Sequence, residues 1–168
     1  RFASWGTSVD FKGLLLDDGA TVQSTHMNQT MRIELVGGSI LSGFGNQSDG
    51  IRCESITDSS NSSLSFGALL AQKLDAEYHM IAVSGKGLIR EWACPYTTAS
   101  TTFVDFYGRV LRSREHLFWD FDRWVPHLVI LYLGGNDFSA LPHPTRAHFQ
   151  AVYRAFIRTI RFFYPDCH

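Results

Sequence analysis

Short apolar runs and longer amphipathic stretches alternate along this chain, which predicts strands that alternate with helices. Residues 31–36 and 128–133 are short and mostly apolar, as strands buried on both faces are. Residues 79–83 form a shorter run of the same kind that ends in a glycine-rich turn. Residues 11–16, followed by Asp17-Asp18-Gly19, predict a further strand that ends in a tight turn.

Three other stretches have helical spacing. Residues 65–78 place four apolar side chains on one face: Phe66, Leu69, Leu70 and Leu74. Residues 103–111 fit a short helix. Residues 143–163 predict a long helix with six apolar residues on one side: Phe149, Val152, Tyr153, Phe156, Ile160 and Phe163. Three arginines fall on its other side, which we interpret as a solvated face: Arg154, Arg158 and Arg161.

The order of these elements, with strands and helices in turn, is typical of a parallel sheet with right-handed crossovers. The chain has 168 residues, of which 45% are hydrophobic, enough for one domain with a proper core. Residues 46–63 are rich in Ser, Asn, Asp and Gly without a period, and predict a surface loop. The sequence therefore predicts an α/β fold.

Composition excludes several classes of function. The formal net charge is −1, and the basic excess of a nucleic-acid-binding surface is absent. No apolar run approaches the roughly 18–20 residues that span a bilayer. The three cysteines, Cys53, Cys94 and Cys167, lack metal-ligand spacing, so we expect no metal site. We expect no other cofactor either. Buried free thiols are the first expectation, and a Cys53–Cys94 disulfide is the alternative.

Three triplets match the N-glycosylation pattern and begin at Asn28, Asn46 and Asn61. The sequence has four asparagines in all, and three of them in such triplets favour a secreted protein. The chain starts at Arg1 without a charged and then apolar leader, so we expect that any signal peptide is removed or lies outside this sequence.

Two glycine-rich stretches after predicted strands contain the candidate chemistry. Ser39 follows two glycines after residues 31–36, and a helix starting there would aim amide N–H groups at the serine oxygen. Asn136 follows residues 128–133 and can donate to an oxyanion. Gly85 follows residues 79–83, where its N–H can approach a bound acyl group. Ordinary turn chemistry explains each stretch alone, but three such residues at the ends of parallel strands converge on one edge of the sheet.

A wider set of motifs is collinear and spans most of the chain: Phe11-Lys12-Gly13-Leu14 with Asp17-Asp18-Gly19-Ala20, Arg32-Ile33-Glu34-Leu35-Val36-Gly37-Gly38-Ser39-Ile40 with Gly43-Phe44-Gly45-Asn46, Ser84-Gly85-Lys86-Gly87, Trp119-Asp120-Phe121, and Leu133-Gly134-Gly135-Asn136-Asp137-Phe138-Ser139. On these motifs the chain resembles the SGNH-type (GDSL-like) hydrolases, and carbohydrate esterase family two in particular. The resemblance implies a flavodoxin-like, three-layer α/β/α sandwich around a parallel sheet. It also implies that residues 1–30 are a linker or remnant of an N-terminal β-sandwich and that residues 31–168 are the hydrolase-type domain.

By this resemblance Ser39 is the nucleophile, and the oxyanion hole consists of the Ser39 amide, Gly85 and Asn136. Trp92 and Trp119 lie in segments expected to face the same edge of the sheet, where sugar rings could stack on them; a structural role for either tryptophan stays open.

The chain departs from the family pattern in two places. Gly38 stands where the family has the aspartate of its Gly-Asp-Ser block, a residue that helps order the nucleophile turn. The family's catalytic histidine lies in a final Asp-x-x-His block, which we expect beyond His168, so the sequence is interpreted as truncated at its C-terminal end. Among the histidines present, His143 is the one with a route to the site.

The first hypothesis is a serine esterase that removes acetyl or other small acyl groups from carbohydrate through an acyl-enzyme, and that acts as a monomer without cofactors. The second hypothesis is a catalytically disarmed carbohydrate-binding protein of the same fold. A nucleotide-binding or phosphate-binding α/β domain is the third, although Gly-x-Gly-x-x-Gly and Gly-Lys-Ser/Thr are both absent.

Overall fold

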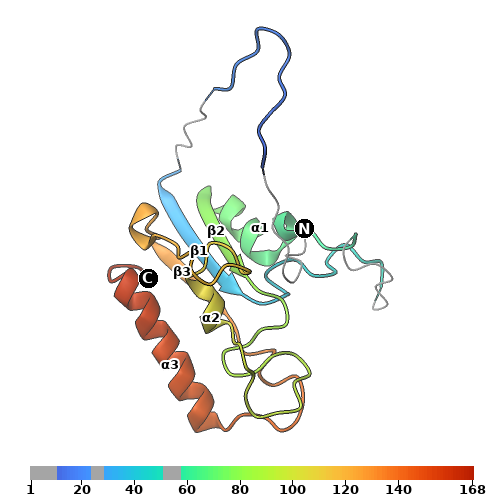
Figure 1. Cartoon of the computed structure of the whole chain (residues 1–168), viewed down its shortest axis with the longest axis vertical. Helices are drawn as coiled ribbons and strands as arrows, with labels where there is room; N and C mark the ends of the chain where they lie inside the picture. The colour runs from blue at the N-terminus through green and yellow to red at the C-terminus, as the bar shows by residue number, and fades with distance from the viewer. Residues whose placement is uncertain (1–10, 24–28, 51–57) are drawn as a thin grey trace.

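The computed structural model describes residues 11–23, 29–50 and 58–168. Three parallel strands form its sheet in the order β2-β1-β3: β1 (Met31–Gly37), β2 (Ala76–Ala82) and β3 (Leu128–Tyr132). Gly37 at the end of β1 is paired with Ala82 of β2 and with Tyr132 of β3. The three strands therefore end at the same level, and the segments that follow them start from one edge of the sheet (Figure 1).

Helices cover both faces of this sheet, so the predicted α/β fold is confirmed. The helices are α1 (Phe66–Lys73), α2 (Val104–Tyr107) and α3 (Arg146–Phe163), with short 3-10 turns η1 (Ser62–Leu64) and η2 (Phe121–Arg123). Figure 1 shows α1 on one side of the strands and α3 on the other. Alternate side chains of a strand point to opposite faces, and β1 accordingly contributes to two cores. Ile33 and Leu35 belong to the core on the α1 side, and Val36 belongs to the core on the α3 side.

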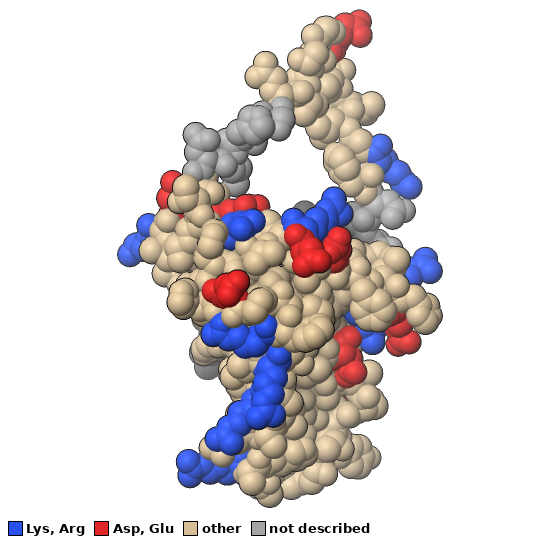
Figure 2. All heavy atoms as spheres, turned by 90° about the vertical axis from the view of Figure 1, so that its left-hand side faces the viewer, with Lys and Arg blue, Asp and Glu red and all other residues tan. Residues whose placement is uncertain are grey.

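The long C-terminal helix follows its prediction closely. Thr145 caps α3 by accepting a hydrogen bond from the His148 N–H, and the predicted apolar face packs against the sheet. The opposite face is exposed and basic, and Figure 2 shows its Arg atoms as a column. None of the helices in the described parts of the chain is long and apolar enough to cross a membrane.

The first helix differs from its prediction in length and in buried face. It ends at Lys73, because Asp75 adopts a positive φ of 46° and β2 begins at the next residue. The residues it buries are small, namely Gly67, Ala68 and Ala71, whereas three of the four predicted apolar residues are exposed: Phe66, Leu69 and Leu74. A Cβ at Gly67 would come within 2.8 Å of Leu35 Cδ1 in β1. The helix thus lies so close to the sheet that only small residues fit between them.

The predicted strand at residues 11–16 is wrong. This segment has no strand partner among the described residues, its side chains are exposed, and Figure 1 shows it projecting from the body. An apolar run forms a strand only where a neighbouring strand pairs with it. The turn after it is confirmed, since the Ala20 N–H donates to the Asp17 carbonyl at 2.9 Å.

Strand β3 lies at an edge of the sheet and is half-buried, where the sequence predicted burial on both faces. On its outer side the Val129 N–H donates to the His168 carbonyl, and the His168 N–H donates to the His127 carbonyl, both at 2.9 Å. Cys94 and Cys167 are buried free thiols, as expected, whereas Cys53 lies outside the described residues.

A buried carboxylate in the central strand connects the sheet to α2 and to the residue that follows α3. Glu34 is 1% exposed and accepts hydrogen bonds from the hydroxyl of Tyr107 at 2.6 Å and of Tyr164 at 3.2 Å. Burial raises the pKa of Glu34 above its ordinary value, and the two hydrogen bonds oppose that rise only in part. Its ionised form is therefore less favourable in the folded protein than in the unfolded chain.

Replacing Glu34 with glutamine tests this penalty. A raised folded-state pKa contributes stability that is present below the ordinary pKa of 4.5 and is lost as pH rises through the folded value. We expect the free energy of unfolding of Glu34→Gln, relative to wild type, to increase as pH rises from about 4 to 8, by about 1.4 kcal/mol per unit of pKa shift. Urea unfolding at several pH values measures it. The exposed Glu115→Gln is the control, and a difference that is constant with pH would contradict the assignment.

A second buried carboxylate joins two of the loops at the strand ends. Asp137 is fully buried, and its carboxylate accepts the backbone N–H groups of three successive residues: Leu88 at 3.1 Å, Ile89 at 2.7 Å and Arg90 at 3.1 Å. The buried Arg90 side chain returns the connection by donating to the carbonyls of Asp137 at 3.1 Å and of Ala140 and Pro142 at 2.6 Å. Residues 88–90 and 137–142 are thereby fixed against each other.

Removing this carboxylate should destabilise the protein strongly. Each buried N–H left without a partner costs about 1–3 kcal/mol, so we expect Asp137→Ala to lose at least about 3 kcal/mol of unfolding free energy. Asp105→Ala is the matched control, because Asp105 also accepts a backbone N–H, that of Thr102 at 2.6 Å, but is exposed. Its expected loss is about 1 kcal/mol. Chemical denaturation measures both variants. Equal losses of unfolding free energy would show that Asp137 stabilises the fold no more than an exposed aspartate does.

Candidate active site

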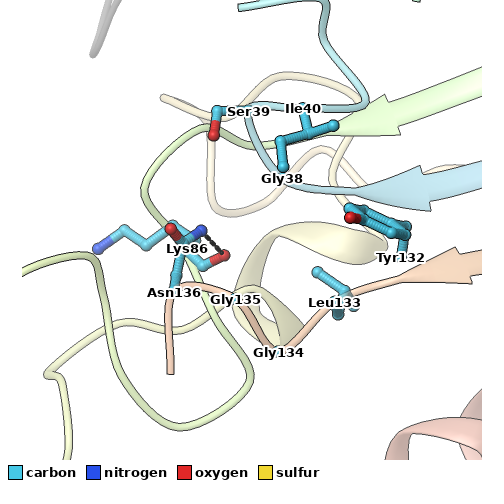
Figure 3. Close-up of a pocket in the computed structure, with 9 residues that line it drawn as sticks. All are labelled: Gly38, Ser39, Ile40, Lys86, Tyr132, Leu133, Gly134, Gly135 and Asn136. Atoms are coloured by element: carbon cyan, nitrogen blue, oxygen red, sulfur yellow. Dashed lines mark hydrogen bonds between the residues drawn. The ribbon is translucent and has the colours of Figure 1, made fainter. Parts of the chain in front are cut away.

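A small pocket lies at the carboxyl ends of β1 and β3 (Figure 3). Its volume is about 50 Å³, and nine residues line it: Gly38, Ser39, Ile40, Lys86, Tyr132, Leu133, Gly134, Gly135 and Asn136. Ser39 and Asn136, 97 positions apart in the sequence, thus belong to the same pocket. This juxtaposition follows from the parallel strands, whose carboxyl ends meet at one edge.

The turn around Ser39 orients its backbone. The Gly38 carbonyl accepts the Ser42 N–H at 3.2 Å, the Ser39 carbonyl accepts the Phe44 N–H at 3.0 Å, and the Ile40 carbonyl accepts the Gly43 N–H at 3.1 Å. Among the described residues the Ser39 N–H has no acceptor. The predicted helix is replaced by a series of turns over residues 39–47. Gly43 and Gly45, with φ of 74° and 65°, account for this irregular path.

Asn136 lies across the pocket from Ser39 in Figure 3. Its side-chain amide donates one hydrogen bond to the Lys86 carbonyl at 2.9 Å. An amide nitrogen has two hydrogens, so the second can serve a ligand. A Cβ added at Gly38 would lie 3.2 Å from this nitrogen. An aspartate at position 38 would therefore contact Asn136, and glycine leaves that side of the pocket as bare backbone.

Gly85 lies beside the pocket without lining it. Its φ of 77° is favourable only for glycine, and its carbonyl accepts the Trp92 N–H at 2.7 Å. In the part of the chain that the structure describes, the N–H of Gly85 has no acceptor. The next residue, Lys86, does line the pocket.

The two predicted tryptophans lie in different places. Trp92 is 68% exposed, and its backbone is bonded to Gly85 next to the pocket. Trp119 does not join this pocket: its ring packs edge-on against His79, with 5.6 Å between centroids, in a separate hollow along β2. The Trp119 N–H donates to the Gly108 carbonyl at 2.8 Å, and this hydrogen bond holds the Trp119 segment beside residue 108, away from the pocket.

None of the described histidines lines the pocket. The ring of His79 stacks on Trp124 with 3.8 Å between centroids, and His127 Nδ1 accepts the Arg32 N–H at 3.0 Å. His143 contacts Phe138 edge-on, with 5.7 Å between ring centroids. The other described histidines, His116, His148 and His168, are exposed, and His26 lies outside the described residues. The described residues also contain no cluster of three or more metal-binding side chains.

Two sets of residues near the site were not identified from the sequence. Asp137 had no role assigned from the sequence, and its carboxylate accepts the backbone N–H groups of residues 88–90. Ser42 and Ser84 contact each other beside Ser39, with 3.3 Å between their hydroxyl oxygens. Polar residues in turns are common, so no local signal distinguished these from ordinary ones.

No protein-family model matches the chain, but curated proteins do. Over 137 residues, 82% of this chain, it is 32% identical to the cellulase/esterase CelE of Acetivibrio thermocellus. Over 135 residues, 79% of this chain, it is 31% identical to an acetylxylan esterase/glucomannan deacetylase of Cellvibrio japonicus. The matched regions are only 16% and 36% of these two relatives, so the chain spans a minor part of each. Both relatives are named as esterases, which are carboxylic ester hydrolases.

Solved structures show the same relationship. A family two carbohydrate esterase from Clostridium thermocellum, in complex with cellohexaose, matches 83% of this chain with a TM-score of 0.74 and 32% identity, over 42% of its own length. Another match has a TM-score of 0.73 and 25% identity, and covers 84% of this chain and 48% of that one. It is described as a carbohydrate esterase whose active site displays divergent catalytic and non-catalytic binding functions. In sequence and in fold, this chain is thus related to the family two carbohydrate esterases.

Proposed function

We propose that the protein is a serine esterase that removes acetyl or other small acyl groups from carbohydrate. The observation that supports this function most directly is that Ser39 and Asn136 line one pocket at the carboxyl edge of the sheet. A hydroxyl, an amide and unoccupied backbone N–H groups are the parts that acyl transfer requires. The esterase relatives support the same reaction class.

In the proposed reaction Ser39 Oγ attacks the carbonyl carbon of the ester. The hydroxyl proton passes to a base, and the carbonyl oxygen becomes an oxyanion that accepts from the N–H groups of Ser39 and Gly85 and from Asn136 Nδ2. The bond to the sugar oxygen then breaks, and that oxygen takes the proton. Water attacks the acyl-enzyme in the same manner and releases the acid.

A base is required because a serine hydroxyl is a weak nucleophile. No aspartate in the sequence is followed by histidine three positions later. In the described part of the chain, His143 contacts Phe138 and does not line the pocket. We propose that the base is a histidine outside these 168 residues.

The proposed substrate is an acetylated polysaccharide. One relative is named for acetylxylan and glucomannan, and a structural relative binds cellohexaose. The exposed Trp92 ring beside Gly85 offers a surface on which a sugar could stack. A substrate of this kind, together with the Asn46 and Asn61 triplets, supports action outside the cell.

A non-catalytic carbohydrate-binding protein is the second candidate. Gly38, in place of the family's aspartate, favours it, and a structural relative is described with divergent catalytic and non-catalytic binding functions. The two candidates differ in one measurable property, since a binding protein retains glycan affinity without releasing acid.

Replacing Ser39 with alanine tests the nucleophile. We expect the full-length protein to hydrolyse 4-nitrophenyl acetate and acetylated xylan, and Ser39→Ala to lose at least about 10³-fold in kcat because no covalent intermediate can form. Ser113→Ala, an exposed serine outside the pocket, should keep the wild-type rate. Normal turnover by a folded Ser39→Ala protein would refute the assignment. An inert wild type that still binds the glycan would establish the second candidate.

Replacing Asn136 with alanine tests the oxyanion donor. Loss of one such donor typically costs about 10²–10³-fold in kcat, because the interaction strengthens only in the transition state. We expect a loss of this size with KM changed by less than about threefold. Steady-state kinetics measures both constants, with Gln150→Ala on α3 as an amide-removal control. A rise in KM alone would assign Asn136 to ground-state binding instead.

A further inference from the structure

Two serines outside the proposed catalytic set connect the turn of Ser39 with the loop of Gly85. Ser42 Oγ lies 2.8 Å from the Ser39 carbonyl oxygen and 3.3 Å from Ser84 Oγ. Both serines are partly buried, and they are 42 positions apart in the sequence. Ser84 directly precedes Gly85, so this contact spans the two sides of the proposed oxyanion hole.

The direction of these hydrogen bonds follows from their chemistry. A carbonyl oxygen only accepts and a hydroxyl has one hydrogen, so the Ser42 hydroxyl donates to the Ser39 carbonyl. The contact between the two hydroxyls must then be a donation from Ser84 to Ser42. The result is a directed chain from Ser84 through Ser42 to the backbone of Ser39, in which each bond polarises the next.

This series of hydrogen bonds ends at the Ser39 carbonyl, and the position of that carbonyl matters for the site. The Ser39 carbonyl also accepts the Phe44 N–H at 3.0 Å, so two donors fix one peptide plane. That plane is the Ser39–Ile40 peptide; the preceding plane, which carries the Ser39 N–H, is held by the Ser42 N–H, which donates to the Gly38 carbonyl at 3.2 Å. Oxyanion donors act through such preorganisation, and displacements near 1 Å can cost up to about 10²-fold in rate.

We propose that Ser42 and Ser84 are positioning residues that set the Ser39 turn against the Gly85 loop. This inference rests on the proposed esterase function, since the geometry it describes is that of the oxyanion hole. A positioning role makes a specific demand: Ser84 must act through Ser42. Two serines that only stabilise their own loops would have independent effects.

The test is a double-mutant cycle in the full-length protein with Ser42→Ala, Ser84→Ala and the double variant. We expect Ser42→Ala to lower kcat about tenfold and Ser84→Ala about threefold, with KM within twofold of wild type. The double variant should be no slower than Ser42→Ala alone. Ser42→Thr retains the hydroxyl and should recover most of the rate. Ser65→Ala, which removes the cap of α1, is a control that lowers stability without touching the site.

Hydrogen exchange gives a readout that does not depend on activity. The N–H groups of Ser42, Gly43 and Phe44 all donate within the Ser39 turn. Their exchange should become faster in Ser84→Ala as well as in Ser42→Ala, and should be unchanged in Ser65→Ala. Unchanged exchange in a folded Ser84→Ala protein would overturn the inference, as would multiplicative effects on kcat. A wild type without esterase activity, in which Ser84→Ala still speeds this exchange, would refute the proposed function and leave the connection between the loops standing.

Discussion

The Asp137 carboxylate is the constraint on which the arrangement of the site depends. It accepts three consecutive N–H groups, of Leu88, Ile89 and Arg90, in a place that water does not reach. Three donors on one buried carboxylate define its position closely, and Asn136 is the residue before it. Gly87 is part of the same constraint, since a Cβ there would meet Asp137 Oδ2 and lie 2.7 Å from the Arg90 carbonyl oxygen. The loops after β2 and β3 therefore form one unit.

The third loop, after β1, joins this unit by different means. Register places the end of β1 level with the ends of its two neighbours, and the Ser42 hydroxyl in the loop after β1 lies 3.3 Å from the Ser84 hydroxyl in the loop after β2. Strand pairing thus places the loop after β1 at the correct edge of the sheet, and side-chain hydrogen bonds between the loops fix its detailed position.

Sequence reasoning worked where a signal is local and failed where it depends on distant neighbours. The β1 and β3 runs and the 3.6-residue period of α3 were sufficient to predict the sheet and its last helix. The buried face of α1 was wrong, because the distance between helix and sheet, which favours Gly67 over leucine, is a property of the packed pair. The strand expected at residues 11–16 and the expected place of Trp119 were wrong for the same reason. Which strand a segment pairs with, and where a side chain lies, depend on residues outside that segment.

Three of the nine residues around the pocket are glycines, Gly38, Gly134 and Gly135, so much of its wall is main chain. Side chains can adapt to a ligand by changing rotamer, but main chain that is held in place by strand pairing cannot. A pocket with such a wall accepts a narrow range of ligand shapes. Ligands of other shapes can be accommodated only by movement at the rim, where the side chains of Ile40 and Tyr132 are exposed.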